Sequence, residues 1–89
     1  MKDLNEYIGN LVVLDTNTDV LYLGKLVSVE KEFVGLDDAD VCCLRDLRST
    51  REQYLVEAAK QGIRKNRTHV EVRSGVIISV SLVKDIIRF

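Results

Sequence analysis

The sequence predicts an all-β fold: a small, strongly bent barrel of five strands, with an N-terminal helix and a helical insert between the third and fourth strands. Two features predict it. Residues 68–89 are rich in valine and isoleucine and contain no proline, a composition typical of strands. The other strand-like segments are short and carry single glycines, at which a strand bends or a second backbone comes close. Short strands that bend at glycines favour a small closed barrel.

The first half of the chain predicts a helix followed by three strands. Residues 3–6 have the capping-box form, an acceptor side chain followed three residues later by glutamate, and Gly9 can end the helix in a left-handed conformation. Residues 37–40 contain three aspartates, but they lack the regular ligand spacing of a calcium loop. We therefore expect them to form a solvated bulge or loop within the third strand. The expected strands are Leu11–Leu14, Val20–Glu30 and Phe33–Leu44, the last two joined by the tight turn Lys31-Glu32.

The second half predicts a helical insert followed by two strands. Residues 49–52 have a second capping-box form, apolar residues then recur at helical spacing, and Gly62 can end the helix. Residues 68–89 divide into two strands near Ser81 or Leu82. We therefore expect one domain over residues 1–89, made of a helix and three strands (1–44), the insert (45–67) and the last two strands (68–89).

Composition indicates a folded, soluble protein of a reducing compartment. Apolar residues make up 46% of the chain and charged residues 30%. The chain has no apolar run of the ~20 residues that a membrane span needs, and its start does not have the pattern of a signal peptide. Cys42 and Cys43 are adjacent on a strand and point to opposite faces, so they are poorly placed to bond each other. A cytoplasmic location is therefore expected.

Nothing in the sequence indicates an enzyme, a metal or a cofactor. His69 is the only histidine, no motif around it marks a nucleophile, and the chain has no glycine-rich phosphate loop. Two adjacent cysteines and one distant histidine are a weak metal-ligand set. We expect His69 to lie at the start of a strand without a chemical role.

Charge is distributed unevenly although the net charge is only −1. Residues 1–44 carry nine acids against three bases, and residues 45–89 carry ten bases against five acids. A generally basic character, which would by itself indicate nucleic acid, is absent. The bases that flank the insert either contact a phosphate backbone or form a solvated face balanced by Glu52 and Glu57, and both interpretations stay open. These bases are Arg45, Arg48 and Arg51 before the helix and Arg64, Lys65 and Arg67 after it.

An ordered set of short motifs resembles the Sm and Sm-like (LSm) family, of which this chain would be a divergent member. The order of elements is similar, and Glu30 stands where the family usually has aspartate. The matching segments are Gly9-Asn10-Leu11-Val12-Val13, Tyr22-Leu23-Gly24-Lys25-Leu26, Leu36-Asp37-Asp38-Ala39 and Val72-Arg73-Ser74-Gly75. The family's base-reading asparagine has no counterpart, and Ser74-Gly75 reverses the usual order after the arginine.

The resemblance implies a non-catalytic ring of six or seven subunits that binds single-stranded RNA around a central pore. In such a ring the fourth strand of one subunit pairs with the fifth strand of the next. Carried over to this chain, the RNA-binding residues are Arg73, with Ser74 and Gly75 beside it, Phe33 as the stacking side chain, and Glu30. Arg64, Lys65 and Arg67 are the candidate phosphate contacts.

The apolar run after Gly75 predicts the subunit interface. Such a run must be covered on both faces or completed by another chain, because a long exposed apolar edge is prone to aggregate. The expected interface residues are Val76, Ile78, Val80, Val83 and Ile86. A second function also stays open: an oligomeric barrel used only for protein interaction or assembly, its nucleotide pocket lost. The missing asparagine and the acidic first half favour this alternative.

Overall fold

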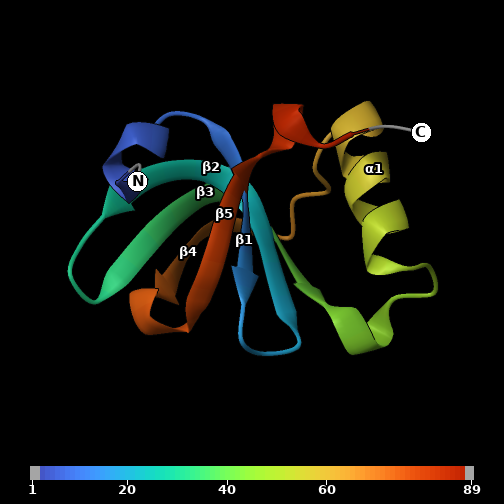
Figure 1. Cartoon of the computed structure of the whole chain (residues 1–89), viewed down its shortest axis with the longest axis horizontal. Coiled ribbons are helices and arrows are strands. Elements are labelled where there is room, and N and C mark those ends of the chain that lie inside the picture. The colour runs from blue at the N-terminus through green and yellow to red at the C-terminus, as the bar shows by residue number, and fades with distance from the viewer. Residues whose placement is uncertain (1–2, 88–89) are drawn as a thin grey trace.

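A computed structural model describes residues 3–87 and contains one bent, antiparallel five-stranded sheet with one α-helix beside it (Figure 1). The strands are β1 (Leu11–Thr16), β2 (Val20–Val29), β3 (Phe33–Cys43), β4 (Arg67–Arg73) and β5 (Ile77–Leu82), and the helix is α1 (Arg51–Gln61). Short 3-10 turns η1 (Leu4–Tyr7), η2 (Leu44–Asp46), η3 (Ser74–Val76) and η4 (Val83–Asp85) connect or flank them. The predicted fold class, with α1 inserted between the third and fourth strands, is confirmed.

The sheet is not closed, which differs from the expected closed barrel. Its strand order is β4-β3-β2-β1-β5, so β4 pairs only with β3 and β5 pairs only with β1 within the described residues. Both strands of the C-terminal run therefore present an unpaired edge.

Bulges between β2 and β3 produce the bend. The pairing shifts register between Leu23 and Lys25 and again between Leu26 and Ser28. At Gly24, an added Cβ would lie 3.1 Å from the Cβ of Ala39, so this glycine permits the close backbone approach that its position predicted. The expected irregularity at residues 37–40 is a bulge within β3 rather than a loop, and Asp38 has a φ of 50° there.

The core has two parts, one on each side of the strongly curved sheet. One part lies inside the bend, and the other fills the space between the sheet and α1. The first contains Val12, Leu14, Leu26, Val34, Leu36, Ala39 and Val72. The second contains Val13, Leu21, Leu23, Cys42, Leu55, Ala58 and Val83. Because α1 supplies Leu55 and Ala58 to the second part, the insert packs on its own sheet.

The helix ends differ in detail from their predictions. The N-terminal capping box of Asp3 and Glu6 is present, and Gly9 has a φ of 92°, but the segment between them is a single 3-10 turn. The capping box of α1 uses Thr50 and Gln53 instead of Ser49 and Glu52. The helix begins one residue later than predicted because two overlapping capping patterns occur there and the second forms both hydrogen bonds.

The division of the C-terminal run at Ser81 or Leu82 was wrong. The break falls at η3 (Ser74–Val76), and β5 then continues to Leu82 before η4. Ser74-Gly75, where the valine- and isoleucine-rich pattern is itself interrupted, marks this break, while Phe89 lies outside the described residues. Within residues 3–87, no helix is long and apolar enough to cross a membrane.

Candidate nucleic-acid interface

Two turns far apart in sequence lie against each other at one end of β3 and β4. We call residues 30–33 and 73–76 the joined turns. The backbone N–H of Ser74 donates to the Glu32 carbonyl at 2.9 Å, and the Ser74 hydroxyl donates to the Lys31 carbonyl at 2.8 Å. Figure 1 shows the short turn between β4 and β5 close to the β2–β3 turn. The Ser74 backbone N–H therefore already has an acceptor within the protein and is not available to a ligand.

Arg73 and Phe33 form the centre of the joined turns. They are direct partners in the β3–β4 pairing, so their side chains leave the sheet on the same face. The guanidinium carbon of Arg73 lies 5.4 Å from the centroid of the Phe33 ring, a cation–π distance. Phe33 is 39% exposed, which is unusual for a large aromatic side chain with a place in the sheet. The arrangement offers a flat, accessible surface on which a base can stack.

Glu32, which the sequence did not indicate as a site residue, lies beside Arg73 and Phe33 in the joined turns. An Oε2 of Glu32 lies 3.8 Å from an Nη1 of Arg73, and both side chains are largely exposed. Nothing in the local sequence joins these two residues, because their proximity follows from the strand register. The ion pair places a negative charge beside the only arginine of the joined turns.

The remaining predicted RNA-binding residues lie in the same place. Glu30 closes the β2–β3 turn through its backbone N–H, which donates to the Phe33 carbonyl at 2.8 Å. Gly75 lies at the surface of η3, and an added Cβ there would meet nothing within 4 Å. The structure thus brings Arg73, Ser74, Gly75, Phe33 and Glu30 together.

The candidate phosphate contacts lie elsewhere. Arg67 begins β4 and Arg73 ends it, so about 20 Å of strand separates them. Lys65 Nζ lies 3.7 Å from Asp38 Oδ2, and an Arg67 Nη1 donates to the Asn66 carbonyl at 2.8 Å. Burial raises the pKa of Asp40, and the positive charge of Arg64 nearby partly opposes that rise. Lys65 and Arg67 thus contact the protein itself, and none of the three bases adjoins the joined turns.

The predicted interface residues divide into exposed and buried ones. Ile78 on β5 is 68% exposed. Val76 and Val80 are half-buried against the first core, and Ile86 is half-buried against the second. Val83 is 8% exposed and belongs to the second core, so its side chain is not available to a neighbouring subunit.

His69 lies inside β4, where it contacts two carboxylates. Its Nδ1 is 2.7 Å from Asp37 Oδ1 on β3, and its Nε2 contacts Glu71 Oε2. The hydrogen bond to Asp37, followed by that to Glu71, raises the pKa of His69 above its ordinary value. His69 is the third residue of β4, close to the strand start where it was expected. The sequence did not predict this cluster, because Asp37 is distant in sequence and meets His69 only across the β3–β4 pairing.

Asp40 is the most buried carboxylate that the structure describes. The Tyr54 hydroxyl and the Asn66 side-chain amide donate to its two oxygens, the latter at 3.0 Å. Burial raises the pKa of Asp40, and the nearby Arg64 opposes this. A hollow of about 430 Å³ lies beside Asp40 and α1. Both carboxylate oxygens thus accept hydrogen bonds from the protein itself. Because Tyr54 belongs to α1 and Asn66 precedes β4, these bonds connect both segments to β3.

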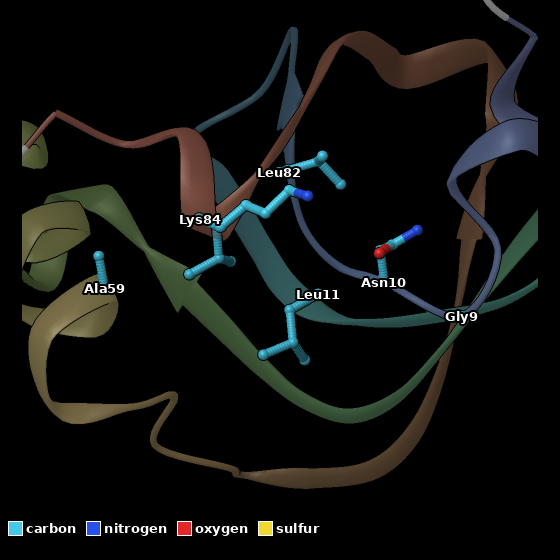
Figure 2. A pocket seen from close by; sticks show the side chains of 7 residues that line it. Gly9, Asn10, Leu11, Ala59, Leu82 and Lys84 are labelled. Carbon is cyan, nitrogen blue, oxygen red and sulfur yellow. The ribbon is translucent and has the colours of Figure 1, made fainter.

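A second hollow, of about 410 Å³, lies where the start of β1, the end of β5 and α1 meet (Figure 2). Ala59 of α1 lies on one side and Asn10 on the other, and Lys84 is its only charged lining residue. None of the residues of the joined turns lines it. Among residues 3–87, no group of three or more histidine, cysteine, aspartate and glutamate side chains is arranged to hold a metal ion.

Comparison with solved structures shows the fold. An Sm protein of Pyrococcus abyssii, solved in complex with a uridine heptamer, superposes with a TM-score of 0.61 at 14% identity, over 92% of this chain and 99% of that one. A chain of the NatC complex bound to CoA gives a TM-score of 0.60 at 18% identity, over 97% of this chain and 91% of that one. The NatC complex bound to Gag peptide and CoA gives 0.57 at 18% identity, with 90% of each chain covered.

The chain therefore has an Sm-like fold. No protein-family model matches it, and no curated protein matches it in sequence. The likeness to these structures is one of fold alone.

Proposed function

We propose that the protein is a non-catalytic, ring-forming Sm-like protein that binds single-stranded RNA around a central pore. The observation that carries the proposal is the pairing of an exposed Phe33 with Arg73 in the joined turns. Aromatic stacking contributes about 1–3 kcal/mol per base, and sequence-tolerant binders of single strands combine it with arginine contacts. An Sm protein of the same fold was solved with a uridine heptamer, which supports RNA as the ligand.

The two sheet edges left unpaired within residues 3–87 support ring formation. β4 and β5 each pair on one side only, and β5 exposes Ile78. An antiparallel or parallel contact between β4 of one copy and β5 of the next would satisfy both edges and repeat head to tail around a closed ring. One aromatic and one arginine per subunit give weak contacts, and a ring multiplies them through multivalency. We propose a cytoplasmic location, which two adjacent cysteines unable to bond each other favour.

Fluorescence anisotropy with short oligo-U and oligo-A at two salt concentrations tests the proposal. We expect salt-sensitive binding that is micromolar or tighter, and a loss of at least about fivefold in Arg73→Ala, which corresponds to about 1 kcal/mol, the lower end for one lost stacked base. Lys60→Ala is the matched control, since it removes one positive charge from an exposed position on α1, outside the joined turns and outside the candidate phosphate contacts. An intact ring that binds neither oligonucleotide would sink the proposal.

The second candidate function is a protein-interaction or assembly module. The similarity in fold to a chain of the NatC complex favours it, because that chain is part of a larger assembly. The Glu32–Arg73 ion pair favours it too, since it satisfies Arg73 within the protein. Retained oligomerisation without any RNA binding in the same titration would select this function.

A further inference from the structure

We propose that Glu32 makes the site at the joined turns selective for unpaired bases by excluding binding through the phosphate backbone alone. The inference rests on the proposed function and deepens it, because it assigns a ligand class to the same residues. Glu32 is a specificity-determining residue in this account: it faces Arg73 across an ion pair of 3.8 Å.

The geometry separates two faces of the Arg73 guanidinium. One face lies over the Phe33 ring at 5.4 Å, and an edge nitrogen points to the Glu32 carboxylate. A phosphate that approached the guanidinium edge would meet this carboxylate. A base that stacks on the exposed Phe33 ring or the guanidinium plane carries no charge and does not need to displace it.

The charge of the joined turns leads to the same conclusion. Glu30 and Glu32 balance Lys31 and Arg73, so this surface has no net positive charge. Affinity for a phosphate backbone depends on neutralising phosphates with bases, and a balanced surface provides little of it. The basic segment after α1 lies at the other end of β4, where Lys65 pairs with Asp38, so it adds no positive charge to the joined turns. Stacking therefore has to supply the affinity, and only unpaired bases can stack.

The test compares Glu32→Gln with the natural chain on two probes: single-stranded oligo-U and an RNA duplex of the same length. Glutamine keeps the size of the side chain and removes its charge. An exposed pair of this kind is worth up to about 1 kcal/mol, so we expect duplex binding to rise about two- to fivefold, or more where several subunits contact one duplex. Oligo-U binding should rise less than duplex binding, and the salt dependence of binding should become steeper.

Two further variants keep the result specific. Glu57→Gln removes the same charge from an exposed position on α1 and should change neither affinity. Glu32→Asp keeps the charge and should leave duplex binding weak. If the natural chain binds oligo-U in an Arg73-dependent way while Glu32→Gln binds the duplex no better, the role of Glu32 is disproved and the proposed function stands. If neither chain binds either probe, both fail.

Discussion

At the scale of single residues, Gly35 shows how the bent sheet depends on a missing side chain. A Cβ at this position would overlap the Ser28 hydroxyl and lie 3.2 Å from Glu71 Oε2. Gly35 is buried in β3 directly opposite Ser28 and Glu71. The close approach of these side chains, rather than backbone conformation, favours glycine here.

We expect Gly35→Ala to lower the free energy of unfolding by about 1–3 kcal/mol, since overpacking forces neighbouring atoms to shift. Urea denaturation followed by circular dichroism measures it. Combining it with Ser28→Ala should recover part of the loss, because the nearest atom is then gone. Gly75→Ala is the matched control and should be nearly neutral, as its Cβ would meet open space. Equal losses at both glycines would refute this reasoning.

The pH dependence of stability is set at the residue scale by His69. Its pKa is raised by hydrogen bonds to Asp37 and Glu71, so the folded protein binds this proton more tightly than the unfolded chain does. The resulting stabilisation is fully present below the ordinary histidine pKa of 6.5 and is lost as the pH rises through the raised folded value.

The urea midpoint should therefore fall as the pH increases from about 6 to about 9, and His69→Gln should flatten this fall. His69 is the only histidine in the chain, so no second imidazole confuses the assignment. A histidine NMR titration gives its pKa directly. A titration at or below the ordinary value would contradict the paired geometry.

At the scale of elements, the proposed ring depends on pairing between β4 of one subunit and β5 of the next. Ile78→Glu places a charge on the exposed part of β5 without entering either core, and we expect it to dissociate the oligomer while the subunit stays folded. Light scattering measures the mass, and circular dichroism checks the fold. Ile86 is a poorer choice because it packs on the second core.

Ile87→Glu makes the same substitution at an equally exposed isoleucine outside the strands, and it should leave the oligomer intact. If Ile78→Glu stays assembled, the interface lies elsewhere on the molecule.

The element order was predictable from sequence because local patterns encode it. Valine and isoleucine runs, the turn at Lys31-Glu32 and the glycine at position 62 all mark their elements correctly. Local patterns could not decide between overlapping alternatives. The two capping boxes that begin at Ser49 and Thr50 differ by one residue, and only the hydrogen bonds of the folded helix distinguish them.

The site was only partly predictable, since strand register determines which residues meet. Arg73, Ser74 and Phe33 were expected to act together, and the structure places them together. The acidic partners of Arg73 and His69 were not predicted. Glu32 and Asp37 are distant from them in sequence and meet them only because β3 pairs with β4. No local pattern carries that information.

At the scale of the whole molecule, folding brings the acidic and basic halves of the chain together. Four ion pairs each join an acid of the first half to a base of the second half: Asp19 with Arg45, Asp15 with Arg51, Asp38 with Lys65, and Glu32 with Arg73. Four of the bases in the second half are thus paired with acids of the first half within one subunit. The proposed binding therefore relies on repeated stacking sites in a ring.

Light scattering coupled to size exclusion, with and without oligo-U, tests this account most directly. The chain has a mass of 10.1 kDa. We predict a single species of six or seven times that mass, which carries the oligonucleotide with it as it elutes. A species of one chain mass, with the oligonucleotide eluting separately, would contradict the account.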